Sequence, residues 1–113
     1  MSRVYFTDRD LGKRFPEILR SSGLNVERHG DHFAPVTPDA EWLEVVGDRG
    51  WIAITHDRRI RYKPNERDAV MLHRVALLVV VGAAQFPDLA RAFVATLPRI
   101  EHFLTEHERP FIA

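Results

Sequence analysis

The chain has 113 residues, no cysteine, and 16 basic against 16 acidic residues, so its formal net charge is zero. This length indicates one domain, residues 1–113, and the lack of cysteine excludes a disulfide scaffold, a thiolate nucleophile and a cysteine zinc site. A neutral chain has no overall charge for gripping nucleic acid, so any RNA contact must be local. The absence of cysteine is compatible with the cytoplasm, which is where we expect the protein.

Neither a signal peptide nor a membrane span is expected. The N-terminus runs directly into strand-like sequence, without the features of a cleaved leader. The longest apolar run, Val75 to Ala84, has about ten residues, whereas crossing a bilayer takes roughly 20. That run instead predicts a buried central strand, and no membrane partner.

Strand and helix signals alternate along the chain. Short apolar runs predict strands, and apolar residues at helical spacing predict helices. In order, they predict a strand at 4–7, a helix at 11–22, a weak strand at 25–29, a loop at 30–36, a helix from 38 to about 47, a strand at 51–55, a helix from 64 to about 74, a strand at 77–81, and helices at about 88–96 and 99–108. Residues 110–113 read as the beginning of an edge strand that the end of the chain truncates. This order predicts an α/β fold with a mainly parallel central sheet of four or five strands and helices on both faces.

Three aspartates stand where separate segments are expected to reach one edge of this sheet. Asp8 follows the first strand, Asp57 follows the strand at 51–55, and Asp39 opens the helix between them in sequence. Parallel strands end at one edge of an open α/β sheet, and ligands bind in the crevice there. Gathered carboxylates repel one another, and a hard divalent cation with oxygen ligands offsets that repulsion. The pattern therefore predicts a shared metal site.

Two of these aspartates also have a simpler structural explanation. Asp8 can cap the helix that follows it, and Asp57 can cap a short turn at 58–61. Asp10 supplies a second acid beside Asp8. Since residues i and i+2 of an extended chain point to opposite sides, only one of the pair is expected to face the crevice, and Asp8 is closer to the strand.

Asp39 has a structural explanation at the start of its helix. Thr37 is the expected N-cap and Pro38 the expected first helical residue, and Asp39 and Glu41 complement the positive end of the helix dipole. A similar cap is expected at Asn65 for the helix that begins near residue 64.

Basic residues directly follow Asp57. Arg58, Arg59 and Lys63 border the predicted crevice, where they can position a phosphate backbone beside a metal, and Tyr62 can stack on a base. The alternative is a solvated charged loop. Among the six histidines, His29 and His32 have a ligand-like spacing, but no second pair stands at a matching distance, so a structural or exposed role is favoured over zinc binding.

Three segments, taken together, resemble a known family. They are FTDRDLG at 6–12, PDAEWL at 38–43 and WIAITHDRRI at 51–60. In this order and spacing they resemble PIN-like domains, most closely the small toxins of the VapC type, in which a strand followed by Thr-x-Asp is the most recognisable mark. The resemblance runs from about residue 3 to residue 81, with a compatible helical tail after it.

The resemblance implies a metal-dependent endoribonuclease, often the toxin of a type II toxin–antitoxin pair. It gives Asp8, Asp39 and Asp57 catalytic and metal-binding roles, with Mg²⁺ or Mn²⁺ as the cofactor. It further implies RNA as substrate, an antitoxin protein as partner and commonly a homodimer. PIN domains usually carry a fourth acid, and no glutamate stands in a matching context here. The substitutes that the chain offers are Asp10, Asp31 and Glu41.

Other classes of protein share parts of this pattern. A signalling receiver domain also has acids after its first strand and an aspartate after its third, but this chain lacks the Thr or Ser and the Lys that receivers place after later strands. A phosphatase of the haloacid dehalogenase type begins with Asp-x-Asp, and this chain departs from that motif at Gly12. A PIN-like domain that has lost catalysis and serves as a binding module is the remaining alternative.

Overall fold

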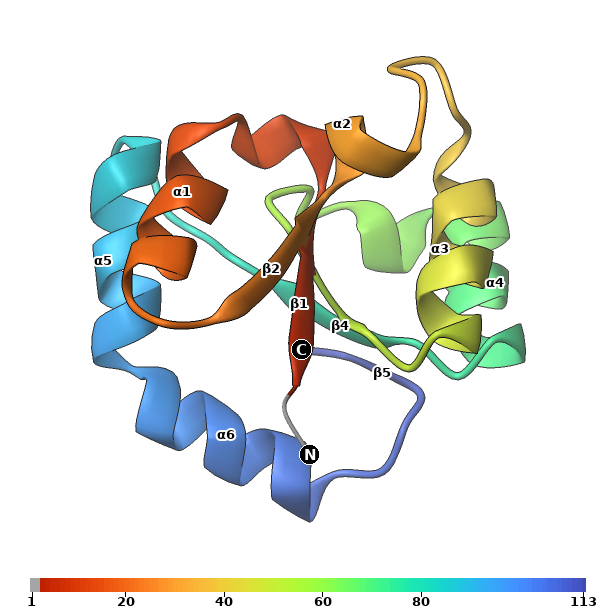
Figure 1. The fold of residues 1–113 in the computed structure, drawn as a ribbon. Helices are drawn as coiled ribbons and strands as arrows, with labels where there is room; N and C mark the ends of the chain where they lie inside the picture. The colour runs from red at the N-terminus through yellow and green to blue at the C-terminus, as the bar shows by residue number, and fades with distance from the viewer. Residues whose placement is uncertain (1–2) are drawn as a thin grey trace.

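A five-stranded sheet forms the centre of the protein, which we describe over residues 3–113 of a computed structural model (Figure 1). The strands are β1 (Val4–Thr7), β2 (Asn25–Arg28), β3 (Ile52–Thr55), β4 (Ala76–Val79) and β5 (Phe111–Ile112). They lie in the order β2-β1-β3-β4-β5, and every neighbouring pair is parallel. The predicted parallel α/β sheet is therefore confirmed, and residues 111–112 form the edge strand that the sequence indicated.

Helices cover both faces of this sheet. They are α1 (Arg14–Ser21), α2 (His29–His32), α3 (Asp39–Asp48), α4 (Pro64–Leu72), α5 (Phe86–Ala95) and α6 (Leu97–Glu106), and two single 3-10 turns are η1 (Arg9–Leu11) and η2 (Ile60–Tyr62). Figure 1 shows α1, α5 and α6 on one side and α3 and α4 on the other. No helix within residues 3–113 combines the length and the apolar character that crossing a membrane requires.

Two hydrophobic cores result from the alternation of side chains along the strands. On β1, Tyr5 belongs to the core beneath α1 and α5, whereas Phe6 belongs to the core beneath α3 and α4. Phe6 stacks on Trp42 of α3 with ring centroids 5.3 Å apart. All four residues of β3 are buried, as expected for a central strand that is covered on both faces.

The helices α3 and α4 meet very closely at Gly47. A Cβ at this position would lie 2.4 Å from the backbone oxygen of His73, at the end of α4. Glycine is therefore required by the packing of the two helices, and both contribute buried side chains to the second core.

Several local predictions were wrong. The segment predicted as a loop at 30–36 begins with the single helical turn α2. The N-caps of α3 and α4 are Pro38 and Lys63, so Thr37 and Asn65 do not cap them. Pro38 precedes the first helical residue, Asp39, because its extended backbone (ψ 143°) is not helical.

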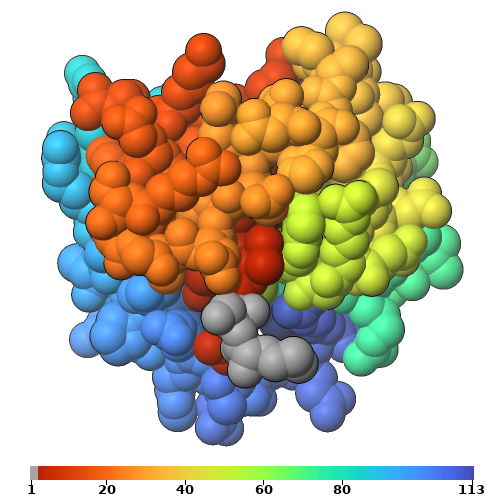
Figure 2. Space-filling model, in the orientation of Figure 1, coloured from red at the N-terminus to blue at the C-terminus, as the bar shows by residue number. Residues whose placement is uncertain are grey.

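The strand order places a topological switch point between β2-β1 and β3. The chain leaves β1 toward β2 on one side and later returns to β3 on the other, so the loops after β1 and β3 diverge. Ligands of open α/β sheets bind in the crevice that such loops leave at the carboxyl ends of the strands. In the space-filling view, the orange to yellow segments from α1 to α3 cover the upper part of the visible face, toward that edge (Figure 2).

Candidate functional site

Asp8 lies directly at the carboxyl end of β1 and is nearly buried, with 8% of its surface exposed. Its backbone N–H donates to the carbonyl of Ile54 on β3 at 2.9 Å. Its Oδ2 accepts a hydrogen bond from the Thr55 hydroxyl at 2.8 Å, and its Oδ1 accepts one from the amide of Arg9 at 2.7 Å. Asp8 is thus also the N-cap of η1. Its capping role and its contact with β3 are therefore compatible.

Asp10 reaches the same hydroxyl as Asp8. Its Oδ2 lies 3.3 Å from the Thr55 hydroxyl oxygen, and the backbone N–H of His56 faces both of its carboxylate oxygens at 3.3 Å. The expectation that only one of the two acids faces the crevice was wrong, because the chain leaves the extended conformation after Thr7 and turns through η1. A hydroxyl has a single proton, so the shorter contact, to Asp8, takes it.

Two carboxylates around one hydroxyl make the ionised state of Asp8 costly. Burial, and after it the negative charge of Asp10, raises the pKa of Asp8 to about 7, against the hydrogen bond from Thr55, which lowers it. The charge of Asp39 adds a smaller upward contribution. Burial of the Asp10 carboxyl group against the end of β3 raises its pKa as well. At neutral pH, this edge of the sheet favours a proton or another cation beside Asp8.

Asp57 is held differently, by an ion pair. Its Oδ2 contacts the Nζ of Lys63 at 2.5 Å, and its Oδ1 accepts a hydrogen bond from the amide of Arg59 at 3.0 Å. Partial burial acts to raise the pKa of Asp57, but these two donors outweigh it and hold the pKa below its usual value. Asp57 is also tied to the other acids, because its own N–H donates to the Thr55 hydroxyl oxygen at 3.2 Å.

Asp39 is the first residue of α3. Its Oδ1 accepts a hydrogen bond from the indole N–H of the buried Trp42 at 2.9 Å. Its charge raises the pKa of both Asp8 and Lys63, so it lies within electrostatic reach of each. Asp8 and Asp57 therefore share one edge of the sheet through Thr55, and Asp39 acts on it through its charge. Within residues 3–113, however, their carboxylates do not form a set in which all the ligand atoms lie within 4.8 Å of one another.

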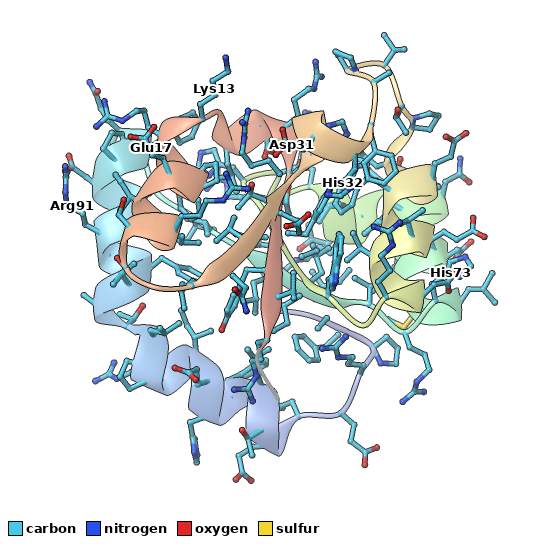
Figure 3. The ribbon with its side chains drawn as sticks, viewed as in Figure 1. Lys13, Glu17, Asp31, His32, His73 and Arg91 are labelled. Carbon is cyan, nitrogen blue, oxygen red and sulfur yellow. The ribbon has the colours of Figure 1, made fainter. Side chains whose placement is uncertain are left out.

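Of the three candidates for a fourth acid, only Asp10 contacts the residues of this edge. Asp31, on α2, lies 3.8 Å from each of its two basic partners, Arg20 and Arg28 (Figure 3). Glu41 is exposed on the first turn of α3. The contacts through Thr55 and His56 thus single out Asp10 as the acid that joins Asp8.

The predicted basic residues differ in their surroundings. Lys63 is engaged by Asp57, whereas the side chains of Arg58 and Arg59 form no ion pair within residues 3–113 and are exposed. Arg58 lines a pocket of about 210 Å³ together with His56. Tyr62 is 78% exposed, so no packing holds its ring in place.

The sequence did not assign two of the residues near the acids to this site. Thr55 belongs to the Thr-x-Asp motif, yet its contacts to both Asp8 and Asp10 depend on the pairing of β1 with β3. His29 is buried beside Phe6, and its Nδ1 has no hydrogen-bond partner among residues 3–113. Burial, with a smaller effect from Arg9, lowers the pKa of His29 and keeps the ring neutral.

A second group of metal-ligand types lies away from this edge. Glu44, Asp48 and His73 each offer one ligand atom within 4.8 Å of the others, and His73 Nδ1 lies 3.7 Å from Asp48 Oδ1. Asp48 and His73 lie at the carboxyl ends of α3 and α4. Asp48 is nine helical steps from Asp39, which corresponds to roughly 13 Å along the helix. Figure 3 shows His73 on the α3–α4 side of the molecule.

Comparison with known proteins identifies the family. The family model described as a PIN-like domain matches residues 3–82, a span that contains every residue of the site at the sheet edge. Neither the curated proteins nor the solved structures gave a match. The chain therefore belongs to the PIN-like domain family, whose members are commonly nucleases. The match gives no support to the receiver and phosphatase alternatives.

Proposed function

We propose that the protein is a metal-dependent endoribonuclease that hydrolyses RNA phosphodiester bonds in the cytoplasm. The observation that carries this proposal is the convergence of Asp8 and Asp10 on the Thr55 hydroxyl at the switch point of a PIN-like sheet. In carboxylates with a purely structural role, basic partners normally offset the negative charges, or the carboxylates lie far from one another. These two are instead held together, with a raised pKa for each.

The residues present fit Mg²⁺ or Mn²⁺. Every side-chain ligand at this edge is a carboxylate oxygen, which is the donor type that hard divalent ions prefer, and Mg²⁺ needs only a few protein ligands because it keeps several waters. Asp8 and Asp57 would hold the ion, together with Asp10, and Asp39 would serve as a further ligand or as the base that orients water. A bound ion of this kind polarises the scissile phosphate, lowers the pKa of an attacking water and offsets charge on the leaving oxygen.

The surrounding residues have distinct tasks in this proposal. Thr55 orients Asp8 through its hydroxyl, and the indole of Trp42 fixes the carboxylate of Asp39. Lys63 keeps Asp57 ionised until the site is loaded. Arg58 and Arg59, which are free of ion pairs within the described part of the chain, would hold RNA phosphates beside the acids.

We also propose that the nuclease is the toxin of a toxin–antitoxin pair. Support comes from the resemblance of its Thr55-His56-Asp57 segment to VapC-type toxins and from exposed apolar side chains at both ends of α4. Tyr62, before α4, and Met71 and Leu72, in its last turn, are exposed by 78%, 49% and 76%. Exposed apolar side chains of this kind suit an antitoxin or a second copy of the chain. Co-expression with the product of the neighbouring gene tests this role, and a small DNA-binding protein that abolishes cleavage would support it.

One observation favours the alternative of a non-catalytic binding module. The carboxylates of Asp8, Asp39 and Asp57 do not close around a common point within the described residues, and Asp57 is already paired with Lys63. A PIN-like domain that keeps this arrangement would not respond to millimolar Mg²⁺.

The experiment that tests the proposal compares single-residue variants on a labelled RNA. We expect cleavage in Mg²⁺ and none in EDTA, with activity abolished by Asp8→Asn and by Asp57→Asn while both variants stay folded. Asp68→Asn, an exposed aspartate of α4 without an ion pair in the described residues, is the matched control and should keep full activity. Full activity in both site variants would remove the assignment.

A further inference from the structure

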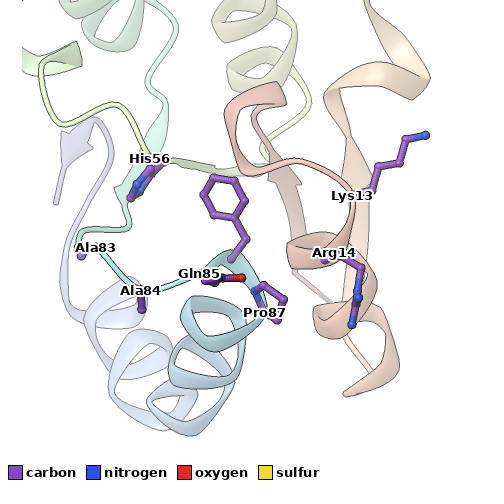
Figure 4. Close-up of a pocket in the computed structure, with 9 residues that line it drawn as sticks. Lys13, Arg14, His56, Ala83, Ala84, Gln85 and Pro87 are labelled. Atoms are coloured by element: carbon purple, nitrogen blue, oxygen red, sulfur yellow. The ribbon is translucent and has the colours of Figure 1, made fainter.

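A pocket of about 440 Å³ opens beside the acids, between the start of α1 and the segment 82–87 that leads into α5. Figure 4 shows Lys13 and Arg14 on one side of it and His56, Ala83 and Gln85 on the other. Pockets that take a small ligand span roughly 300–1,000 Å³. None of the functions assigned above to the acids, Arg58 or Arg59 uses this space.

The polar groups around the pocket are free to meet a ligand. The backbone N–H groups of Gly82 to Gln85 donate no hydrogen bond to other described residues. The side chains of Lys13 and Arg14 likewise form no ion pair or hydrogen bond within residues 3–113. Two unpaired cations across the pocket from unused amide donors favour an anionic ligand, and a phosphodiester is such a ligand.

The same pocket also presents an aromatic ring. Phe86, the first residue of α5, is half-buried and packs edge-on against the His56 ring, with centroids 5.6 Å apart at 88°. The ring is only partly buried against the first core, and the part that stays exposed lines the pocket. The amide of Gln85 can donate to and accept from the edge of a planar heterocycle. An aromatic face beside a side-chain amide and cations is the chemistry by which proteins hold unpaired nucleobases.

His56 connects this pocket with the acids. Its ring lines the pocket, its Nδ1 lies 2.8 Å from the Val80 carbonyl, and its backbone N–H faces Asp10. Lys13 also borders a smaller pocket of about 190 Å³ that Asp8 and Arg28 line. Because Lys13 borders both pockets, a chain held at Asp8 can continue past Lys13 into the larger one.

We propose that this pocket takes one base of single-stranded RNA next to the scissile phosphate, with Phe86 stacking on the base and Lys13 and Arg14 holding the adjoining phosphate. The inference rests on the proposed nuclease function, since it places the substrate relative to the acids. It assigns base selection to Gln85 and Phe86, which lie outside the acidic motif.

The test measures binding without cleavage. Isotope-labelled protein in EDTA is titrated with each of the four homopolymeric RNA pentanucleotides, with an abasic pentanucleotide and with inorganic phosphate, and affinities and amide NMR shifts are recorded. Phe86→Leu keeps an apolar side chain but removes the stacking face. Ala84→Leu fills the pocket from an exposed position, so folding is not at risk. Phe103→Leu on α6, a half-buried aromatic outside the pocket, is the matched control.

We expect at least one pentanucleotide to shift the amides of residues 82–85. Loss of a stacked base weakens binding roughly 5- to 150-fold, so Phe86→Leu, Ala84→Leu and the abasic chain should each bind at least about fivefold more weakly, and Phe103→Leu should bind normally. Equal affinity for the abasic chain, shifts confined to residues outside the pocket, or no RNA binding would overturn the inference. A separate Mg²⁺ titration of the RNA-free protein, read at the amides of Arg9 and His56, distinguishes the failures. If Mg²⁺ still shifts these amides, only the proposed base pocket is refuted. If Mg²⁺ has no effect, the proposed nuclease function is refuted as well.

Discussion

Replacing Asp8 by Asn should stabilise the protein at alkaline pH, because the native fold holds this carboxyl group where ionisation is costly. Burial and Asp10 raise the pKa of Asp8 to about 7 from an ordinary 3.8. Between these values the native state keeps a proton that the unfolded state has released, so stability falls as pH rises through this window and levels off above it. The stability that the bound proton contributes is complete below pH 3.8, the ordinary pKa, and is lost by about pH 7.

The magnitude follows from the two pKa values. Each tenfold difference in acidity corresponds to about 1.4 kcal/mol, so the interval from 3.8 to about 7 gives an upper limit of about 4 kcal/mol. The Asn amide has a single acceptor oxygen, so it keeps one of the hydrogen bonds from Thr55 and Arg9 and loses the other, at a cost of about 1 kcal/mol. We therefore expect Asp8→Asn to gain about 2–3 kcal/mol over the wild type at pH 8 and close to nothing at pH 4.

Urea unfolding at pH 4 and pH 8 in EDTA measures both values, with Asp68→Asn as a control that should stay within about 0.5 kcal/mol of the wild type. Adding Mg²⁺ at pH 8 should stabilise the wild type and leave the Asn variant unchanged, since a ligand stabilises only the form that binds it. Parallel pH profiles for the wild type and Asp8→Asn would refute the reasoning.

Three further substitutions probe the neighbourhood of the site. Thr55→Val should destabilise the fold by about 1–3 kcal/mol, because the carboxylate of Asp8 loses its donor and the amide of Asp57 loses its acceptor. Chemical denaturation at pH 8 measures this loss, and an unchanged stability would contradict these contacts. Lys63→Met should raise the pKa of Asp57 toward its ordinary value, which an NMR titration of the carboxyl group can follow. The loss of stability should be less than about 1 kcal/mol, because the ion pair is partly exposed. An unchanged pKa of Asp57 would contradict the ion pair. Gly47→Ala should destabilise the fold by at least about 2 kcal/mol, since the new methyl group would clash with the His73 carbonyl. A urea midpoint equal to that of the wild type would show that the two helices are not in close contact.

The architecture could be predicted because its signals are local and strong. The Trp51–Ile54 run is apolar throughout, and a strand of that kind has to be buried on both faces. The run at 77–81 is apolar in the same way, and the strand there, β4, begins at Ala76 and ends at Val79. The single turn α2 was missed because four residues around a glycine carry no helical periodicity.

The site was predictable only in part, because its contacts depend on turns rather than on strands. The positions of Asp8, Asp39 and Asp57 at one edge follow from parallel strand ends. The contacts of Asp10 with Thr55 and His56 do not follow from the strands, since they require the turn η1. The pairing of Lys63 with Asp57 likewise requires η2, which returns the chain toward the strand end across six residues.

The most direct test of the account is to locate a bound divalent ion within the protein. Substoichiometric Mn²⁺, which broadens NMR signals of nearby nuclei, can be added to isotope-labelled wild-type protein at pH 8. We predict selective broadening of the amides from Asp8 to Leu11 and from Thr55 to Asp57, and its loss in Asp8→Asn. Broadening centred on Glu44, Asp48 and His73, or none at the ends of β1 and β3, would contradict the assignment of the metal to the acids of the sheet edge.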